Sequence, residues 1–278
     1  MPASRVAPTL AIIGAGHVGR VFGRLFADCG AFTVQDVLTR SSASAQAGVA
    51  FIGAGCAVPA MASLRSADVY LLAVTDDQIA PSCAALAASR SLQGALVFHC
   101  SGAKSSQELH AAHAAGAWVA SVHPIRSFAD PAAVARDFAG TFCGVEGDPQ
   151  ALSMLADPLA AIGARAVAID AHAKTVYHAA AVFASNYLVT VLDVALRAYQ
   201  SAGIAEDVAR QLAGPLATET LANVLRLGPE AALSGPIARG DMATVARQQG
   251  AVEQWDAASG RLYAALAEAT VALAARRR

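Results

Sequence analysis

The chain has 278 residues, of which 55% are hydrophobic and only 15% charged, and its formal net charge is −1. This composition argues against a disordered chain, and the small net charge argues against a nucleic-acid-binding surface. Five scattered cysteines without a CxxC pair indicate reduced thiols and no metal site, and we find no apolar stretch that reaches the roughly 20 residues of a membrane span. We therefore expect a globular cytoplasmic protein.

The first half of the chain alternates short β-rich runs with helical patterns. The candidate strands are "TLAIIG", "FTVQDVL", "VAFIG", "DVYLLAV", "GALVFHC", "AWVASV", "TFCGVE" and "RAVAI". This alternation is typical of a parallel sheet with crossover helices. After Asp170, apolar residues recur only at helical spacing. We predict an α/β fold with a doubly wound parallel Rossmann sheet over residues 1–170, followed by a smaller all-α domain over residues 171–278.

The first predicted strand leads into a glycine-rich turn and then an amphipathic helix. Gly14 would make the tight turn, Gly16 would let a pyrophosphate approach the backbone, and Gly19 would allow close packing of helix on strand. The phosphates would lie at the helix N-terminus. The expected cofactor-binding residues of this turn are Gly14, Ala15, Gly16, His17, Val18 and Gly19.

The end of the second predicted strand distinguishes NADP from NAD. An acidic residue there would bind the ribose 2′-hydroxyl of NAD, but the chain has Thr39, Arg40 and Ser41, and Asp36 lies too early in the strand. A guanidinium suits a 2′-phosphate, because it donates two parallel charged hydrogen bonds. We therefore expect NADP rather than NAD, with an ordinary solvated loop charge as the alternative interpretation of Arg40.

Later strands end in further candidate residues. Ligands of doubly wound sheets bind at the carboxyl ends of the strands, so Val74 and Thr75 should border the cofactor, and Ser101 and Gly102 should lie near the nicotinamide. After the sixth strand, His123 and Arg126 are candidate substrate-binding residues. Arg126 could hold a substrate carboxylate. Structural roles are the alternative for both.

The run "AKTVYHAAAVFASNYLVTVL" places three polar side chains on one long apolar helix. Lys174 and His178 are four residues apart and share a helix face, so both can address one ligand. Asn186 is rotated away and would reach only an extended ligand. We expect Lys174 or His178 to handle a proton and Asn186 to orient the substrate; a histidine bonded to backbone is the alternative for His178. Arg239, in "LSGPIARGD", would either reach the substrate or hold its own loop.

The Rossmann motif followed by an all-helical half resembles the superfamily of β-hydroxyacid dehydrogenases, phosphogluconate dehydrogenase and pyrroline-5-carboxylate reductase. More narrowly, "HCSGAKS", "SVHPIRSF", "KTVYHAAAVFASNYL" and "LSGPIARGD" resemble the motifs of a bacterial family that pairs a Rossmann-like domain with a helical domain of unknown function and is described as NADP oxidoreductases. The β-hydroxyacid dehydrogenases carry a catalytic lysine followed four residues later by an asparagine. Here Lys174 is followed by His178, and "HPIRSF" stands where those enzymes have a Ser-Gly-Gly loop.

The resemblance implies an NADP-dependent dehydrogenase or reductase that acts on a small carbonyl or imine compound between the two domains. It also implies a homodimer formed through the helical domain, whose alanine-rich helices could approach closely. Two other functions stay open: an NADP-binding sensor or regulatory module without turnover, and an oxidoreductase that uses a deazaflavin.

Overall fold

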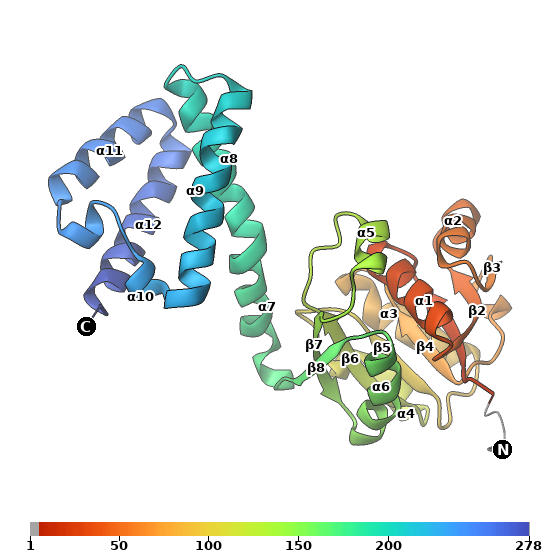
Figure 1. The fold of residues 1–278 in the computed structure, drawn as a ribbon. Helices are drawn as coiled ribbons and strands as arrows, with labels where there is room; N and C mark the ends of the chain where they lie inside the picture. Colours follow the sequence, from red (N-terminus) through yellow and green to blue (C-terminus); the bar gives the residue numbers. More distant parts are fainter. Residues whose placement is uncertain (1–5, 278) are drawn as a thin grey trace. The chain divides into compact units, whose positions relative to one another are not determined.

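The computed structural model describes residues 6–277 (Figure 1). Its strands are β1 (Thr9–Ile13), β2 (Thr33–Leu38), β3 (Cys56–Val58), β4 (Val69–Leu72), β5 (Leu96–His99), β6 (Trp118–Pro124), β7 (Phe142–Gly147) and β8 (Arg165–Ala168). Helices α1 (His17–Cys29), α2 (Ser42–Ile52), α3 (Ile79–Ser89), α4 (His110–Ala114), α5 (Pro131–Arg136) and α6 (Pro149–Ala161) alternate with these strands. Short 3₁₀ turns occupy Met61–Ser63, Asp76–Gln78 and Ser106–Leu109.

The eight strands form one sheet in the order β3-β2-β1-β4-β5-β6-β7-β8. Neighbouring strands from β3 to β6 run parallel, which is the doubly wound Rossmann arrangement. Strand β7 pairs antiparallel with β6, in a register that places His123 opposite Gly144, and β8 then pairs parallel with β7. The predicted fold class is confirmed, with one reversal of direction in a mostly parallel sheet.

The predicted strand "VAFIG" is wrong, because these residues form the end of α2. The buried residues of that helix are Ala45, Gly48 and Ile52, which follow a helical spacing, and Gly53 ends the helix in a left-handed conformation. The third strand is instead the short segment Cys56–Val58. A brief apolar run does not by itself distinguish a strand from a buried helix segment.

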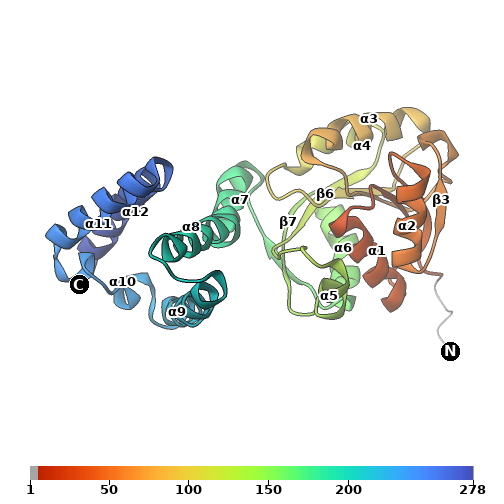
Figure 2. The same cartoon turned by 90° about the horizontal axis from the view of Figure 1, so that it is seen from above.

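Helices cover both faces of the sheet. Helices α1, α5 and α6 pack on one face, where Phe22, Val134 and Leu155 belong to the larger cluster of buried side chains. Helices α3 and α4 pack on the other face, around Leu86 and Ala112 (Figure 2). With both faces covered, the strands are fully buried in the middle of the sheet, and β4 and β5 are buried along their whole length.

The chain divides into two compact units between Val182 and Phe183. The 3₁₀ turn Ala171–Ala173 and helix α7 (Lys174–Val182) therefore belong with the sheet, twelve residues beyond the expected boundary at residue 170. The second unit begins with a π-helical segment, Phe183–Tyr187. Its remaining elements are α8 (Leu188–Ser201), α9 (Glu206–Leu227), α10 (Pro229–Ala232), a 3₁₀ turn (Ile237–Arg239), α11 (Met242–Trp255) and α12 (Ala257–Ala275).

The helical unit has little core of its own. Helix α8 packs against α9, and α11 packs against α12 (Figure 2). Across residues 183–277, the buried residues are Ala209, Ala213, Val245, Ser259 and Gly260, all of them small except one valine. Such a set removes little apolar surface from water, although burial of apolar surface is the main favourable contribution to folding.

One helical run is long and apolar enough to cross a membrane, by length and composition alone. It extends over Ala171–Ser201, 31 residues, with a mean hydropathy of 1.7 in its most apolar window. Our expectation that no stretch reaches this length was wrong, since four successive helical segments join into one run. The run begins, however, with the side chain of Lys174 buried against the sheet.

Candidate active site

The turn between β1 and α1 has the backbone that its glycines predict. Gly14 has a φ of 93°, and a Cβ atom there would lie 2.3 Å from the carbonyl oxygen of Ala73. A Cβ atom on Gly19 would lie 2.4 Å from the oxygen of Gly14. Both positions therefore accept only glycine. They let the first turn of α1 pack directly against the carboxyl ends of β1 and β4.

Gly16 is different, because a Cβ atom there would meet nothing within 4 Å. It is the N-cap of α1 and no side chain caps this helix, whose first turn has no acidic residue. The amide groups of this turn and the positive end of the helix therefore face open space, with no carboxylate in the turn itself to repel an anion. His17 is fixed beside them, because its Nδ1 donates to the carbonyl of Phe128 over 2.6 Å.

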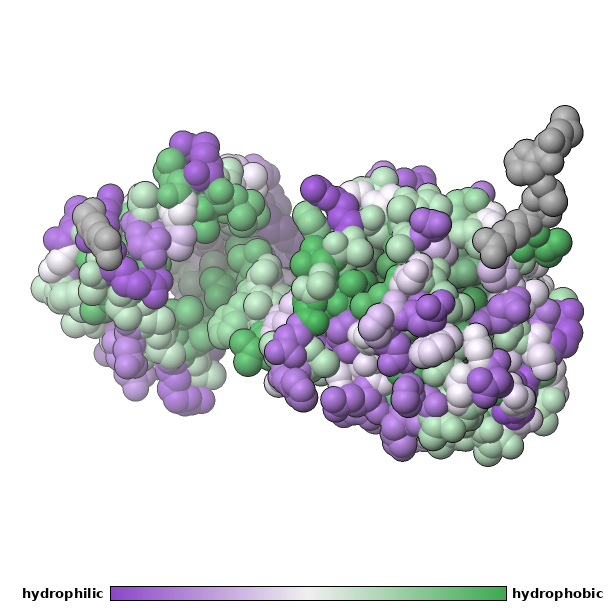
Figure 3. Space-filling model, turned by 90° about the horizontal axis from the view of Figure 1, so that it is seen from below, coloured by the Kyte–Doolittle hydropathy of each residue, from purple (hydrophilic) through white to green (hydrophobic). Residues whose placement is uncertain are grey.

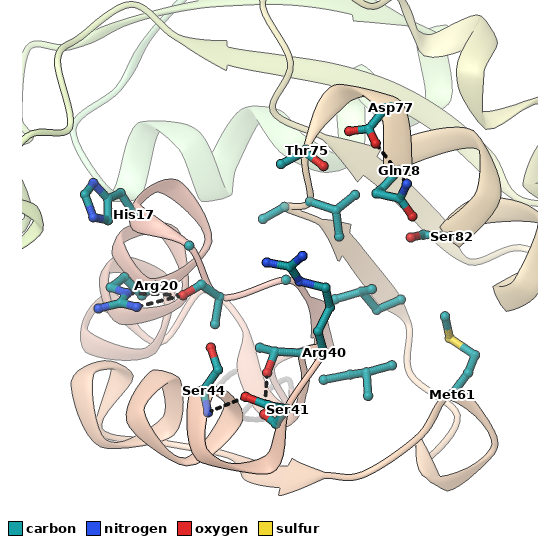
Figure 4. Close-up of a pocket in the computed structure, with 18 residues that line it drawn as sticks. His17, Arg20, Arg40, Ser41, Ser44, Met61, Thr75, Asp77, Gln78 and Ser82 are labelled. Carbon is teal, nitrogen blue, oxygen red and sulfur yellow. Dashed lines mark hydrogen bonds between the residues drawn. The ribbon is translucent and has the colours of Figure 1, made fainter.

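A cavity of about 910 Å³ opens over this turn (Figure 4). Of the residues expected to bind cofactor, its lining includes Gly14, Ala15, Gly16, His17, Thr39, Arg40, Ser41, Val74 and Thr75. Val18 and Gly19 lie on the packed side of α1, and Ser101 and Gly102 lie outside this cavity. The lining residues that the sequence analysis did not identify include Arg20, Ser44, Met61, Asp77, Gln78 and Ser82.

Arg40 extends into the cavity between the end of β2 and the segment that carries Thr75 (Figure 4). It forms no ion pair with any residue of 6–277, so its guanidinium is open to a ligand. Ser41 accepts a hydrogen bond from the amide of Ser44 over 3.2 Å and caps α2, while Thr39 donates to the carbonyl of Ser41 over 2.8 Å. These bonds fix the loop that presents the guanidinium.

Asp36 is occupied by another partner. Its buried carboxylate accepts from the Arg65 guanidinium over 2.6 Å and from the Arg65 amide over 2.7 Å. Burial opposes ionisation of this carboxyl, but the hydrogen bonds from Arg65 prevail and hold its pKa below the usual range. The one carboxylate on β2 is therefore not presented to a ribose, as its position in the strand predicts.

The end of β5 is held by a buried histidine. The amide of Ser101 donates to Nδ1 of His99 over 3.1 Å, so Nε2 of His99 carries the proton and donates to the carbonyl of Ser105 over 3.0 Å. Burial lowers the pKa of His99 to about 4, which keeps the ring neutral. The Ser101 hydroxyl accepts from the amides of Ala103 and Lys104 and shapes the loop that follows.

Lys174 is buried behind this loop, with 1% of its surface exposed. Its ammonium donates to the carbonyl of Ser101 over 2.9 Å and to the hydroxyl of Ser121, and it lies 3.5 Å from the Glu146 carboxylate. Glu146, itself 5% exposed, also accepts from the amide and the hydroxyl of Ser106. Burial lowers the pKa of Lys174, while the Glu146 charge opposes this shift. All three ammonium protons therefore point at protein oxygens.

A second cluster lies on the other side of Gly102 and joins β6 to α7. Nδ1 of His123 is 2.8 Å from the Tyr177 hydroxyl, and the His123 ring lies edge-on to His178 with 5.5 Å between centroids. A Cβ atom on Gly102 would lie 2.3 Å from Nδ1 of His178 and 2.8 Å from Nε2 of His123. Burial lowers the pKa of His123 to about 4. The structure therefore brings together Lys174, His178, Ser101, Gly102 and His123 around one loop.

Three predicted site residues lie elsewhere. The Arg126 guanidinium donates to the carbonyl of Asp137 and to the Thr141 hydroxyl, so it fixes the return from β6 to β7. Asn186 is exposed in the π-helical segment, and its backbone carbonyl accepts from Thr190. Arg239 is exposed next to Asp241, which caps α11. Asn186 and Arg239 belong to the helical unit, and their proposed contacts with substrate stay predictions.

Two family models match the chain. Residues 3–124 match a Rossmann-like domain, and residues 141–270 match a domain of unknown function, DUF2520. The chain therefore carries a Rossmann-like domain followed by a DUF2520 domain, which confirms the family resemblance drawn from its motifs. No curated protein matches the sequence at a significant level.

Solved structures share the fold over nearly the whole chain. A candidate NADP oxidoreductase from Bacteroides fragilis, BF3122, has a TM-score of 0.78 at 20% identity, covering 95% of this chain and 98% of its own. Protein TM1727 from Thermotoga maritima has a TM-score of 0.73 at 26% identity, covering 97% and 100%. A reductive aminase from Aspergillus terreus, in complex with NADPH and ethyl-5-oxohexanoate, has a TM-score of 0.66 at 20% identity, covering 97% and 93%.

Proposed function

We propose that this protein is a cytoplasmic NADP-dependent oxidoreductase that acts on a small carbonyl or imine compound. The observation that carries the proposal is the cavity over the β1–α1 turn, where an open Gly16 and an uncapped helix N-terminus lie opposite the unpaired Arg40. Similar folds in the candidate NADP oxidoreductase and in the NADPH-bound reductive aminase support it.

The cavity residues fit the phosphates of NADP. The first turn of α1 would hold the pyrophosphate at Gly16 and His17, and Arg40 would meet the 2′-phosphate with the hydroxyls of Thr39 and Ser41 beside it. When bound, NADP supplies or accepts the hydride at its nicotinamide. The protein must then position the substrate and move one proton.

For the proton, the contacts favour His178 over Lys174. Lys174 is enclosed by Ser101, Ser121 and Glu146, so its proton has no path to a ligand without breaking this set of bonds. His178 lies beside Gly102 of the same loop, and no residue of 6–277 bonds its Nδ1. We propose that His178 exchanges the proton, that Lys174 fixes the loop, and that Asn186, His123, Arg126 and Arg239 are tested as substrate contacts.

The cofactor is tested by titration with NADPH and NADH. We expect NADPH to bind more tightly, and Arg40→Gln to weaken NADPH roughly 10- to 100-fold, the value of one or two charged hydrogen bonds, with little change for NADH. Arg24→Gln is the matched control, because Arg24 is an exposed arginine of α1 outside the cavity lining. Equal affinities for both cofactors in the unmodified protein would contradict the NADP assignment.

Turnover is tested with NADPH and a panel of small ketones, 2-oxo acids and cyclic imines. We expect His178→Ala to lower kcat by about 100-fold or more, in the range for loss of a general acid or base. Lys174→Ala should act mainly through stability. Tight NADPH binding without turnover of any panel member would favour the regulatory module over the enzyme.

We further propose that the helical unit forms a homodimer with a second copy of the chain. Its exposed apolar side chains include Phe183 (69% exposed), Val189, Leu212, Leu216, Leu221 and Leu225 (79% exposed), while five residues of 183–277 are buried. Figure 3 shows apolar (green) residues between polar ones at the surface of this unit. An apolar groove of about 290 Å³ between α8, α11 and α12 adds to this surface. A unit that buries so little by itself needs a partner surface.

The dimer is tested by light scattering after size-exclusion chromatography. We expect a dimer that Leu216→Glu and Leu225→Glu convert to a less stable monomer, whereas Val6→Glu, an exposed apolar position in the Rossmann unit, leaves it intact. A monomer in dilute solution would contradict the proposal. Recovery of the unmodified chain only with membranes would instead favour insertion of the run Ala171–Ser201.

A further inference from the structure

The side chain of Tyr177 packs against β7 at a position where only glycine leaves enough room. Its hydroxyl rests over Gly144, where a Cβ atom would lie 2.3 Å from the hydroxyl oxygen. Gly144 is the cross-strand partner of His123, so the same contact brings the hydroxyl to 2.8 Å from Nδ1 of His123. The hydrogen bond between Tyr177 and His123 therefore depends on three elements. Helix α7 carries the tyrosine, β6 carries the imidazole, and the glycine of β7 leaves room for the hydroxyl.

The direction of this hydrogen bond follows from its two partners. His123 is the hydrogen-bond partner that residues 6–277 offer the Tyr177 hydroxyl, so the phenolic proton has a protein acceptor only if Nδ1 presents its lone pair. Nδ1 then carries no proton, and the proton of the neutral ring lies on Nε2. Burial also lowers the pKa of His123 to about 4, which keeps this neutral form near pH 7.

The Nε2 edge of His123 faces Gly102 and is without a hydrogen bond to residues 6–277. The ring is only partly buried, and Nε2 is not closed off from solvent, in contrast to Nδ1 of His178, which is buried without a partner. Nδ1 of His178 faces the Gly102 Cα and has no partner there. Of the two imidazole nitrogens that face Gly102, the one open to a ligand is therefore Nε2 of His123.

Among residues 6–277, no carboxylate forms a hydrogen bond or ion pair with His123 or His178. Glu146 is the carboxylate buried in the sheet next to these histidines, and Lys174 and Ser106 already occupy its oxygens. The other groups whose charges reach His123 are His178, Lys174 and the exposed Asp76. A protonated iminium would bring a positive charge beside a neutral N–H donor and a lysine, while the buried carboxylate nearby, Glu146, is already paired with Lys174.

We propose that Tyr177 is a positioning residue that fixes His123 as a neutral Nε2–H donor, and that this donor binds the carbonyl oxygen of the substrate. The substrate class is thus a ketone or 2-oxo acid rather than a cyclic imine. This assignment rests on the proposed oxidoreductase function for the identity of the ligand, whereas the role of Tyr177 stands on the geometry of the cluster.

The role of Tyr177 is tested by NMR of the full chain labelled with ¹⁵N at histidine, with His123→Gln to assign the signal. We expect the Nε2–H tautomer of His123 near pH 7, and a shift toward a tautomer mixture in Tyr177→Phe and in Gly144→Ala. Tyr263→Phe is the matched control, since it removes a hydroxyl bonded to Gln248 in the helical unit. His99 serves as an internal reference, because its tautomer depends on Ser101 and Ser105 and should not change. An unchanged His123 tautomer in Tyr177→Phe, or an Nδ1–H form in the unmodified protein, would overturn the role.

The substrate class is tested by adding pyruvate or 1-pyrroline to the labelled protein in the presence of NADP⁺. We expect pyruvate to shift the His123 Nε2 signal, and 1-pyrroline, which is protonated near pH 7, to leave it in place. A shift with 1-pyrroline alone, or with neither compound, would overturn the carbonyl assignment. The proposed function fails separately, if NADPH does not bind or is not oxidised by any carbonyl or imine of the panel.

Discussion

Lys174 shows how burial changes the meaning of a residue that spacing alone singles out. Its position four residues before His178 suggested a catalytic amine, but its ammonium is enclosed at the junction of the Ser101 loop, β6 and β7. Lysines are almost never fully buried unless paired. The ion pair with Glu146 thus explains why the residue is charged, and the bonds to Ser101 and Ser121 explain what it holds in place.

We predict that Lys174→Met destabilises the Rossmann unit by about 3 to 5 kcal/mol, because it leaves Glu146 buried without its countercharge. Glu146→Leu should have a similar effect, and Lys174→Met combined with Glu146→Leu should cost less than the two single changes together. Urea unfolding followed by circular dichroism measures these differences.

The control for this prediction is the half-exposed pair of Lys104 and Glu108, whose charged atoms are 3.1 Å apart. Lys104→Met should change the free energy of unfolding by about 1 kcal/mol or less, since water reaches this pair and screens it. If Lys174→Met cost no more than this control, the buried pair would not have the stabilising role that its geometry indicates.

At the scale of elements, the β1–α1 turn contains two glycines that are needed for different physical reasons. Gly14 is required by the fold, since its φ is positive and Ala73 lies against it, whereas Gly16 has open space where its side chain would be. We predict that Gly14→Ala lowers both stability and NADPH affinity. Gly16→Ala should lower NADPH affinity at least 10-fold with little change in melting temperature, because the methyl group would occupy the approach of the pyrophosphate. Calorimetric titration and thermal unfolding of the same samples measure both quantities.

This pair of variants distinguishes a cofactor site from a merely structural turn. In a structural turn, Gly16→Ala would be neutral in both assays, and unchanged NADPH affinity would contradict the proposed site. Gly30→Ala is a suitable control, because Gly30 ends α1 in a left-handed conformation with nothing near its Cβ position. Its effect should fall on stability alone.

The sequence predicted those elements whose signals are local. Each strand–turn–helix unit carries its own signals, such as the glycine spacing and the alternation of strands with helices. The position of Asp36 too early in its strand is a signal of the same local kind. The segment "VAFIG" was ambiguous because four apolar residues before a glycine fit a helix end and a strand equally well. The antiparallel β7 could not be read at all, because strand direction depends on the path of the chain between residues 125 and 141.

The site shows the same division. Arg40 was found because it follows a strand end directly, while Glu146 and Tyr177 were missed because their partners are distant in sequence: Lys174 is 28 positions after Glu146, and His123 is 54 before Tyr177. Only the pairing of β6 with β7 brings Gly144 beside His123 and so gives Tyr177 its place. A glycine in the middle of a predicted strand was the one sequence signal for that close approach.

At the scale of the whole molecule, two buried histidines make the stability of the Rossmann unit depend on pH. The pKa values of His99 and His123 fall to about 4 in the folded unit, from 6.5, mainly through burial. Below pH 6.5 the unfolded chain therefore takes up protons that the folded unit does not, so the free energy of unfolding falls as the pH drops from 6.5 to about 4. The contribution of these neutral histidines to the free energy of unfolding is fully present above pH 6.5. For the fully buried His99 alone, the loss is about 3 kcal/mol.

We predict that His99→Gln flattens this dependence, because the amide can still donate to Ser105 but does not titrate between pH 4 and 6.5. Carboxyls with lowered pKa values, such as Asp36 and Asp68, begin to lose their contribution only below about pH 5, so the range from pH 6.5 to about 5 reports the histidines. The measurement is urea unfolding at several pH values in a Trp255→Phe background, where the fluorescence reports Trp118 of β6. His113, an exposed histidine of α4, provides the control variant His113→Gln, which should keep the unmodified slope. A His99→Gln protein with that same slope would show that His99 is not the group that links protonation to unfolding.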